Sequence, residues 1–379
     1  MRPRAEVCAG VKVRKILITS IGNRVSEAIV DRLESRRSAL TVVGVNSIAS
    51  AAGNFRADTV YLVPPSEPLA PFLARMREIL AAERPDLVLA GRDGDLAGLA
   101  MLREEPAFKA TFFLCPSSAV VAVVRDTHRT FEFARAHGLP FAESIVDAAN
   151  LDDLIRRKGL PLIGKPRDGH GSIGVTVVRT RDQALAVLAK GGLMLQEFLN
   201  VPADLDAGLP DLRLGMPLHY AVGWQRCVSP GAVLGESGKV LASNAINIDF
   251  IAGVETRMAL NQTPAGEAVI RGYAEALGRI GMIGPINIQC HQLPDGSLVP
   301  FEINARFFGS TTARAYFGFD CVAIAVDYFL EGRLPASPET PAEACHIVRP
   351  AIDRVVREAD IERLGRDGKW TASSARTTS

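Results

Sequence analysis

The sequence carries no clear excess of charge of either sign and no long apolar run. Its 379 residues include 43 basic and 42 acidic side chains, which gives a formal net charge of +1. Nucleic acids and anionic membranes usually attract proteins with a basic excess, so this balance argues against both partners. No apolar stretch approaches the roughly 18 residues that cross a bilayer, and the basic residues 1–14 contain no apolar signal region. We therefore expect a cytoplasmic protein with no nucleic-acid and no membrane partner.

Cysteine is sparse, and no two cysteines form a Cys-x-x-Cys pair. The six cysteines are scattered at positions 8, 115, 227, 290, 321 and 345. This pattern argues against a disulfide scaffold and indicates reduced, mostly buried thiols. The hydrophobic share of 47% and the charged share of 22% are ordinary for globular proteins, so a sizeable core is expected. The length allows two or three domains.

The first third of the chain alternates apolar runs with helical patterns. Strands are expected at residues 15–20, 42–45, 59–63, 86–90 and 112–115, with helices between them. This alternation predicts a doubly wound parallel α/β domain over residues 15–120. Ligands of such folds bind beyond the carboxyl ends of the strands, so residues 20–24 and 91–95 should line a cleft. Asp93 and Asp95 have two interpretations: substrate contacts, or carboxylates that the helix dipole favours at a helix start.

Two common nucleotide-binding loops are missing. Residues 20–25 contain one glycine, Gly22, where the dinucleotide fingerprint needs three. A glycine-rich loop does occur at residues 167–174, between the apolar strand 160–166 and the β-branched run 175–178. It is not a Walker A loop, because no Gly-Lys-Ser/Thr opens a helix there.

The glycine-rich loop is nevertheless a candidate phosphate site. Glycine lets backbone N–H groups close around phosphate oxygens, and Lys165 in the preceding strand can add a point charge. The alternative is a flexible hairpin loop without a ligand. Lys165 weakens that alternative, because a lysine inside an apolar strand needs an anion nearby.

A hairpin is predicted where two apolar runs flank Pro294-Asp295-Gly296-Ser297. With Asp295 and Gly296 as the two central turn residues, Gln289 lies across from Glu302 and Asn287 across from Asn304. Strand alternation then separates the side chains into two faces. The apolar face contains Ile286, Ile288, Cys290, Phe301 and Ile303, and the polar face contains Asn287, Gln289, Glu302 and Asn304.

The polar face of this hairpin is a candidate metal site. Paired strand residues have Cβ atoms roughly 5 Å apart, so the oxygens of Gln289, Glu302 and Asn304 can converge on one point. Mg²⁺ prefers a few such oxygens together with water and substrate phosphates. The alternative is a solvated outer face of an ordinary hairpin. We favour the metal site, because the face is dominated by carboxamides and leads directly into Arg306.

Further elements complete the sequence-based expectations. The strand 193–199 ends in the polar pair Gln196-Glu197, which suits an adenine pocket formed by nearby backbone groups, or is an ordinary strand end. Strands are expected at 223–228 and 239–244, joined by a turn at 231–238. Helices are expected at 264–281 and at 321–330, the latter capped by Asp320. The Ser/Thr/Ala-rich tail 371–379 is expected to be disordered.

Three of these segments together resemble the ATP-grasp superfamily, nearest to its carbamoyl-phosphate-synthase-like single-unit ligases. They are residues 165–174, residues 196–199, and Gln289 with Glu302-Ile-Asn304-Ala-Arg306. The resemblance covers residues 15–335 and is specific for the superfamily rather than for a substrate. It implies an α/β plus α+β protein, in which the doubly wound domain 15–120 precedes a two-subdomain ATP-grasp fold. The small subdomain, with the glycine-rich loop, would be 121–200, the larger one, with the metal hairpin, 201–335, and residues 336–379 would form a C-terminal extension.

The resemblance also implies roles for individual residues. Lys165 and the glycine-rich loop would hold the ATP phosphates, with loop contacts from Arg167, Gly169, Gly171 and Ser172. Adenine would bind at Glu197, Phe198 and Leu199, and Asp204 would contact the ribose. Mg²⁺, or Mn²⁺ in its place, would bind Gln289, Glu302 and Asn304, while Arg306 and Lys165 stabilise the transferring phosphoryl group. Family members commonly have lysine at the position of Thr127, so Arg125 or Arg129 would have to replace it at the α-phosphate.

The implied activity is that of an ATP-dependent carboxylate–amine ligase. ATP would convert a carboxylate into an acyl phosphate, and an amine would displace phosphate to form an amide, releasing ADP and phosphate. The substrates would be small, amino-acid-like carboxylates and amines, selected by residues 20–24, 91–95 and 307–314, where Arg314 could hold a carboxylate. A homodimer is compatible with this reading. The alternative is a non-catalytic, nucleotide-binding regulatory protein of the same fold.

Overall fold

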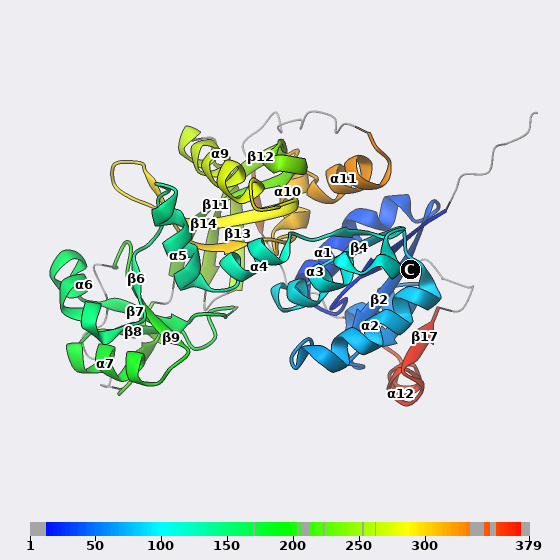
Figure 1. Ribbon diagram of the computed structural model, residues 1–379, viewed down its shortest axis with the longest axis horizontal. Coiled ribbons are helices and arrows are strands. Elements are labelled where there is room, and N and C mark those ends of the chain that lie inside the picture. Colours follow the sequence, from blue (N-terminus) through cyan, green and yellow to red (C-terminus); the bar gives the residue numbers. More distant parts are fainter. Residues whose placement is uncertain are drawn as a thin grey trace, which may run out of the picture. The chain divides into compact units, whose positions relative to one another are not determined.

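The chain divides into two units by its internal contacts. The computed structural model in Figure 1 describes residues 13–169, 171–202, 205, 212–222, 224–251, 254–261, 263–333, 345–348 and 354–372. The first unit combines Met1–Leu114 with Arg354–Ser379, and the second is Cys115–Asp353. The boundary at residue 114 lies six residues before the one expected from the sequence.

The first unit is built on a six-stranded sheet with the order β17-β3-β2-β1-β4-β5. β1 to β5 are parallel, which confirms the doubly wound α/β fold predicted for this region. Its strands are β1 (Arg14–Ile18), β2 (Leu40–Asn46), β3 (Thr59–Leu62), β4 (Leu87–Leu89), β5 (Phe112–Leu114) and β17 (Lys369–Thr371). Its helices are α1 (Arg24–Leu33), α2 (Leu69–Glu83), α3 (Leu96–Glu104) and α12 (Glu358–Asp367).

Local sequence explains the first crossover of this unit. The side chain of Asn23 accepts a hydrogen bond from the backbone N–H of Ser26 and so caps α1. Ala28, Ile29 and Leu33 recur at helical spacing and are buried against the sheet side of the unit. β1 is central, so the strand order reverses between β1 and β4, where their carboxyl ends form the topological switch point.

The last described segment returns to this unit. β17 pairs antiparallel with β3, matching Trp370 to Val60, and thereby covers the sheet edge. The Trp370 ring meets Phe55 edge-on at a centroid distance of 5.2 Å, and its indole N–H donates to Asp360 at 2.9 Å. Residues 354–372 therefore belong structurally to the first unit, although the sequence indicated only a C-terminal extension.

The second unit contains two sheets, of which the smaller has the order β10-β8-β7-β9-β6. Its strands are β6 (Ser144–Ile145), β7 (Leu162–Pro166), β8 (Thr176–Val178), β9 (Leu193–Glu197) and β10 (Met216–Pro217). α6 (Leu151–Lys158) and α7 (Arg181–Ala189) share a core with β7, β8 and β9. The predicted capping box starts α7, because Thr180 and Gln183 bond each other's backbone reciprocally. The helices α4 (Ser118–Val124), α5 (Thr127–Ala136) and α8 (Leu218–Ala221) complete this part.

The larger sheet is antiparallel, with the order β15-β14-β11-β12-β13-β16. Its strands are β11 (Trp224–Leu234), β12 (Val240–Ile251), β13 (Val254–Asn261), β14 (Gly284–Gln292), β15 (Leu298–Asn304) and β16 (His346–Val348). α9 (Pro264–Gly278), α10 (Thr311–Tyr316) and α11 (Cys321–Ala325) pack with it, and the Asp320 side chain caps α11 as expected. The helix predicted over 321–330 is α-helical over Cys321–Ala325 and π-helical over Val326–Leu330.

One expectation for this sheet is wrong, and one of its strands was not foreseen. β11 and β12 are longer than predicted, so the connection between them shrinks from residues 231–238 to residues 235–239. β13, which pairs with β12, was not anticipated. In β11 and β12, Gly, Pro and Asn occur within paired strands, and long-range pairing overrides their local preference for turns.

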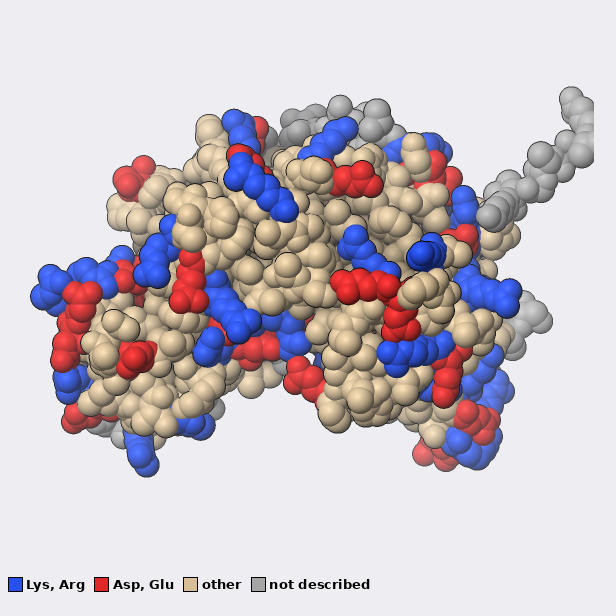
Figure 2. Space-filling view, viewed as in Figure 1, with Lys and Arg blue, Asp and Glu red and all other residues tan. Residues whose placement is uncertain are grey.

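Surface charges agree with the composition. On the face shown in Figure 2, basic and acidic side chains lie close to one another and do not gather into an extended patch of one sign. Among the described residues, no helix is both long enough and apolar enough to cross a membrane.

Candidate functional site

The hairpin β14–β15 has the predicted pairing at its polar end. Asn287 pairs with Asn304 and Gln289 with Glu302. The turn, however, is not the predicted two-residue turn. Gly296 N–H donates to the carbonyl of Leu293, Leu293 N–H donates to Ser297, and Gly296 has a φ of +86°. The loop is therefore a type I turn followed by a left-handed glycine, which shifts the register by one residue.

A β-bulge restores the predicted register. Gln289 pairs with Glu302 but the next residue, Cys290, pairs with Pro300, so Phe301 is the extra residue. The Phe301 ring lies 4.8 Å from the ring of His291 and packs against a core that includes Cys227. Phe301 thus does not lie on the apolar face with Ile288, as the simple alternation predicted. Pro300 was the available signal, because proline inside a strand is typical of edge strands and bulges.

Polar side chains on this face are linked in a short chain. The Asn304 amide donates to a Glu302 carboxylate oxygen at 3.1 Å, and Arg306 donates to the Asn304 carbonyl oxygen at 3.0 Å. Glu302 and its cross-strand partner Gln289 are half-buried, whereas Asn304 is buried. Three residues expected to hold a metal are therefore adjacent, with Arg306 beside them.

These residues suit a hard cation that also binds phosphates. Gln289 and Asn304 offer carboxamide oxygens and Glu302 offers one carboxylate, which are ligand types that Mg²⁺ accepts. Within the described ranges, no group of three or more His, Cys, Asp or Glu side chains could hold a metal ion. A divalent cation at this face would thus retain a net positive charge after Glu302 binds it. That remaining charge favours an anionic ligand such as a nucleotide phosphate.

Lys165 lies beside the same face. Its side chain comes from β7, is 9% exposed and donates one hydrogen bond, to the backbone oxygen of Phe301 at 3.3 Å. Burial lowers the pKa of Lys165 to about 8, and the nearby Glu302 carboxylate opposes this shift. An ammonium group has three donors. Lys165 therefore retains donors for an anion.

The glycine-rich loop has the backbone expected of a ligand-binding loop. Gly171, Ser172 and Gly174 have positive φ angles of +60°, +56° and +75°. Gly169 and Gly171 are exposed, and Ser172 is half-exposed. A non-glycine residue in the left-handed region is uncommon, and such positions cluster at ligand sites.

Ion pairs hold the first two residues of this loop. Arg167 donates two hydrogen bonds to Asp126, at 3.2 and 2.6 Å, and Arg125 pairs with Asp168. Asp126 also caps α5, so the arginine predicted to contact phosphate is oriented by a helix start. Arg167 remains a predicted phosphate contact, although in this structure its guanidinium binds Asp126.

The position of Thr127 has no lysine, and the two candidate substitutes differ. Arg125 is engaged with Asp168, whereas Arg129 has a side chain 58% exposed and lies 4.0 Å from Asp126. Thr127 itself donates its backbone N–H to the carbonyl of Arg167. Arg129 is the more accessible candidate for the α-phosphate.

The strand end predicted to hold adenine is partly committed to other contacts. The Glu197 carboxylate lies 2.7 Å from Lys158, and its backbone N–H donates to Glu143. Phe198 packs against a cluster that includes Ile163, and Leu199 is 9% exposed. Adenine contacts would thus come from the backbone and from Phe198 rather than from the Glu197 carboxylate. Asp204 lies outside the described residues.

Arg314 does not occupy the position expected of a substrate contact. It is 0% exposed, and all three of its guanidinium nitrogens donate hydrogen bonds within the chain. A carboxylate substrate has no access to it in this structure. The expectation that Arg314 binds substrate directly is therefore wrong.

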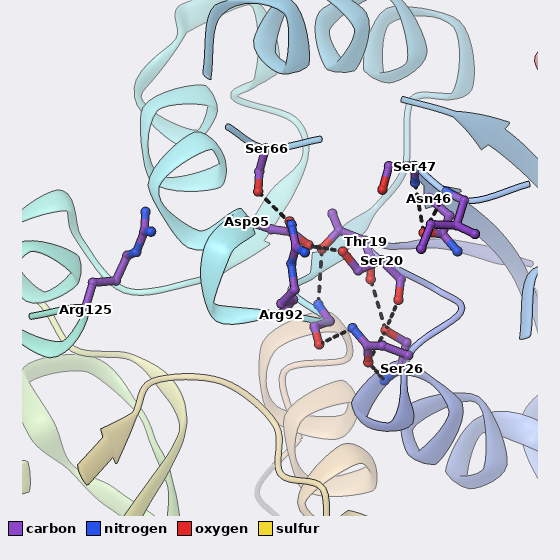
Figure 3. A network of polar contacts seen from close by, with 12 residues as sticks. Thr19, Ser20, Ser26, Asn46, Ser47, Ser66, Arg92, Asp95 and Arg125 are labelled. Carbon is purple, nitrogen blue, oxygen red and sulfur yellow. Dashed lines mark hydrogen bonds and ion pairs between the residues drawn. The ribbon is translucent and has the colours of Figure 1, made fainter. Parts of the chain in front are cut away.

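The first unit contains a separate polar cluster at its switch point (Figure 3). Thr19 and Ser20 each donate a hydroxyl to Asp95 at 2.7 Å, and Arg92 lies 3.5 Å from its other oxygen. Asp95 is 1% exposed, and Ser20 has a φ of +48°. Asp95 is the N-cap residue of α3, the helix start that the second interpretation named, and its carboxylate also ties the loop after β1 to that start.

Glycine is required at one point of this cluster. A Cβ atom on Gly91 would lie 2.0 Å from the carbonyl oxygen of Thr19 and 2.1 Å from the Ser26 hydroxyl. The Gly91 backbone can therefore approach β1, where its N–H donates to the Thr19 hydroxyl at 3.1 Å.

Solved structures of other proteins share this fold. N5-carboxyaminoimidazole synthetase from Staphylococcus aureus superposes with a TM-score of 0.67 at 12% identity, covering 94% of this chain and 86% of that one. L-amino acid ligase from Bacillus licheniformis superposes with a TM-score of 0.60 at 18% identity, covering 84% and 74%. The chain has the ATP-grasp fold. The ATP-grasp architecture expected from the hairpin and the glycine-rich loop is thus confirmed.

Sequence relatives are similar over shorter stretches. D-alanine–D-alanine ligase from Chromohalobacter salexigens is 32% identical over 157 residues, which are 38% of this chain and 48% of the relative. The corresponding ligase from Bacteroides fragilis is 30% identical over 104 residues, or 26% and 30%. The chain therefore spans about half or less of the length of these relatives. No family model matches the chain.

Proposed function

We propose that this ATP-grasp protein is an ATP-dependent carboxylate–amine ligase. The observation that carries the proposal is the convergence of Lys165, Glu302 and Asn304, with Gln289 paired to Glu302 and Arg306 bonded to Asn304. This set offers cations and metal-binding oxygens, which suit phosphoryl transfer by positioning and electrostatic stabilisation. Such chemistry needs no nucleophilic side chain.

Each residue has a defined part in this proposal. Gln289, Glu302 and Asn304 would hold Mg²⁺, which would neutralise charge on the ATP phosphates. Lys165 donates to a phosphate oxygen, and the glycine-rich loop at 167–174 covers the phosphates and excludes water. Arg306 stabilises negative charge on the transferring phosphoryl group and the acyl phosphate. The amine then attacks the acyl carbon, phosphate leaves, and the amine proton passes to solvent or phosphate.

Amino acids are the substrates that the comparisons favour. The sequence relatives are D-alanine–D-alanine ligases, and one structural neighbour is an L-amino acid ligase. We therefore propose an amino-acid-like carboxylate and an amino-acid-like amine. Bicarbonate is the alternative carboxylate to test, because another neighbour is a biotin carboxylase domain whose structure contains bicarbonate.

The alternative function is a nucleotide-binding regulator without turnover. It would explain the absence of lysine at Thr127. It leaves Arg306 without a role, because a regulator needs nucleotide binding but not the stabilisation of a transferring phosphoryl group. The ligase is therefore the better-supported proposal.

Substrate-dependent ADP release tests the proposal. Full-length protein with Mg·ATP is screened against pairs of D- and L-amino acids and against bicarbonate with an amine, and products are identified by mass spectrometry. We expect ADP release that needs both substrates, together with a melting temperature that rises with Mg·ATP concentration. A melting shift without any substrate-dependent ADP would support the regulator, and no shift at millimolar Mg·ATP would overturn both proposals.

A further inference from the structure

A positively charged side chain is buried at the polar face of the hairpin, next to the Asn287 side chain. Arg314 comes from α10, is 0% exposed, and reaches three strands of the larger sheet. Its acceptors are the Asn244 and Ser229 side chains and backbones, the Asn287 side chain and the Ser310 hydroxyl, at 2.6–3.4 Å. All of these acceptors are uncharged. Burial lowers the pKa of Arg314 to about 10, so it remains charged at neutral pH.

A buried cation with neutral partners is costly, so its position calls for an explanation. Transfer of a charge from water into the interior is unfavourable unless hydrogen bonds and a counter-charge compensate it. The guanidinium here has the hydrogen bonds, and the Glu255 carboxylate partly opposes its desolvation. The guanidinium lies over the Phe308 ring, 4.8 Å from the centroid, which adds a cation–π contact. A methionine or leucine would avoid the desolvation cost but would leave the buried acceptors of Arg314 without this donor, so the guanidinium links the strands and the loop that supply them.

The contacts of Arg314 converge on the segment that follows Arg306. Arg306 donates to the carbonyl of Phe307 at 2.8 Å, and the next residues, Phe308 and Ser310, are held by Arg314 from the other side. The Phe308 N–H donates to the Thr311 hydroxyl at 3.1 Å, which closes the turn. The orientation of Arg306 therefore depends on a loop whose far side is anchored by Arg314.

Arg314 also reaches the metal ligands through one intermediate residue. It donates to the Asn287 side-chain oxygen at 3.2 Å, which the Ser229 hydroxyl also contacts. Asn287 is the cross-strand partner of Asn304. The same guanidinium thus contacts the strand partner of Asn304 and the loop that follows Arg306.

The backbone leaves space for this arrangement at one glycine. Gly231 pairs with Asn244 and with Asn287, and a Cβ atom there would lie 2.9 Å from an Arg314 terminal nitrogen. The φ of Gly231 is not in the left-handed region, so a side chain is excluded by the arginine rather than by backbone strain. Gly231→Ala should displace the guanidinium without removing its charge.

We propose that Arg314 is a positioning residue of the phosphoryl-transfer site, which orients Arg306 and Asn304 through the loop 307–310 and through Asn287. The proposal rests on the function proposed above. Arg314 touches neither nucleotide nor substrate. Its loss should slow phosphoryl transfer while leaving nucleotide binding by Lys165 and the glycine-rich loop intact.

The test compares Arg314→Met, Arg314→Lys and Gly231→Ala with Ile288→Val as the matched control. Ile288 is buried in the same strand as Asn287 but lies on the opposite face. Three quantities are measured on the full chain: kcat for substrate-dependent ADP release, the Kd of Mg·ADP by calorimetry, and amide hydrogen exchange in residues 307–312.

We expect kcat to fall roughly tenfold or more in Arg314→Met, as hydrogen bonds from a charged group are lost. Gly231→Ala should show a similar fall and Arg314→Lys a partial recovery, whereas the Kd of Mg·ADP should rise by less than kcat falls in these three variants, and both quantities should be unchanged in Ile288→Val. Amides 307–312 should exchange faster in Arg314→Met and Gly231→Ala only. Adding Arg314→Met to Arg306→Met should reduce kcat little further, because one residue acts through the other.

Defined outcomes overturn the proposal. If kcat is unchanged in folded Gly231→Ala and Arg314→Lys, or if the two arginine substitutions act additively, Arg314 does not position Arg306. If Arg314→Met does not fold, Gly231→Ala and Arg314→Lys decide. A parent protein that lacks Mg·ADP binding and ADP release overturns the proposed function instead, while hydrogen exchange still reports whether Arg314 holds the loop.

Discussion

Each unit contains a polar cluster built around one carboxylate, Asp95 in the first unit and Glu302 in the second. The two carboxylates differ in how many hydrogen bonds they accept. Asp95 is 1% exposed and accepts two hydroxyl hydrogen bonds in addition to its contact with Arg92. Glu302 is half-buried and accepts a side-chain hydrogen bond from Asn304, while the nearby Lys165 ammonium has further donors. A saturated carboxylate stabilises architecture, whereas one with open acceptor positions beside an unsaturated cation can take a ligand.

The largest effect is expected at Glu302. Glu302→Gln keeps the shape of the side chain but removes the charge that a cation at this face would need. The activation free energy should rise by about 3 kcal/mol, which lowers turnover roughly a hundredfold. Steady-state ADP release with an active substrate pair measures this, and the melting temperature of the ligand-free protein should change little.

Asn304→Asp is the companion variant for Glu302→Gln. It retains an oxygen ligand and adds charge, so its loss of turnover should be smaller. Near-normal ADP release in Glu302→Gln would mean that the metal site lies elsewhere and that the interpretation of this hairpin is wrong.

A smaller effect is expected when the cation beside Glu302 is removed. Lys165→Ala should weaken Mg·ATP binding roughly tenfold to a hundredfold, because one charged hydrogen bond to phosphate is lost. Calorimetry measures the Kd, and circular dichroism checks that the fold persists. Arg257→Ala is the control for the loss of a basic side chain, because Arg257 lies on β13 and bonds His346. If Lys165→Ala binds ATP as tightly as the parent protein does, Lys165 has only a structural role.

The opposite pattern is expected at Asp95. Asp95→Asn weakens the bonds from Thr19 and Ser20 and removes the negative charge beside Arg92, which should lower the free energy of unfolding by about 2 kcal/mol. Turnover should stay within a few-fold of the parent at temperatures where the variant is folded. Urea denaturation measures the first quantity and ADP release the second.

Glu78→Gln is the surface control for Asp95→Asn. Glu78 forms an exposed ion pair with Arg75, and such pairs contribute about 0.5 kcal/mol or less. A loss of turnover in Asp95→Asn without loss of stability would contradict the distinction between the two clusters, because it would assign Asp95 to substrate binding.

The smallest change is expected when the protein is left unaltered and only the pH is varied, because nucleotide binding then changes gradually. The pKa of Lys165 is about 8 rather than 10.5, because burial disfavours its ammonium form. Above pH 8 the free protein loses this proton and must regain it to bind phosphate, so Mg·ATP affinity should fall by up to about tenfold per pH unit. Isothermal titration between pH 7 and about 10 measures the slope.

Stability should change in the reverse sense over the same range. Between about pH 8 and 10.5 the unfolded chain binds more protons at Lys165 than the folded chain, so this residue makes the ligand-free protein more stable as pH rises. Lys165→Met should remove both contributions. A slope of Mg·ATP affinity that persists in Lys165→Met would assign the titration to another group.

Much of the fold was accessible from local patterns. The alternation of apolar runs with helices predicted the parallel sheet, and Asn23, Thr180 and Asp320 cap helices as such residues do. The pairings of Gln289 with Glu302 and of Asn287 with Asn304 were predicted correctly, but for an incomplete reason. A three-residue loop and a bulge at Phe301 each shift the register by one residue, and the two shifts cancel.

The sequence by itself thus determined where the strands, caps and turn-forming glycines lie, because each of these depends on a few neighbouring residues. Only the tertiary structure decided which polar groups are saturated. Arg314 and Asp95 are charged residues beside loops, which made them candidate substrate contacts in the sequence, yet both are buried by segments far away in the chain. Pairing of β17 with β3 was likewise decided by packing. The physical reason is that desolvation and hydrogen-bond saturation depend on every group that surrounds an atom, and distant segments supply most of those groups.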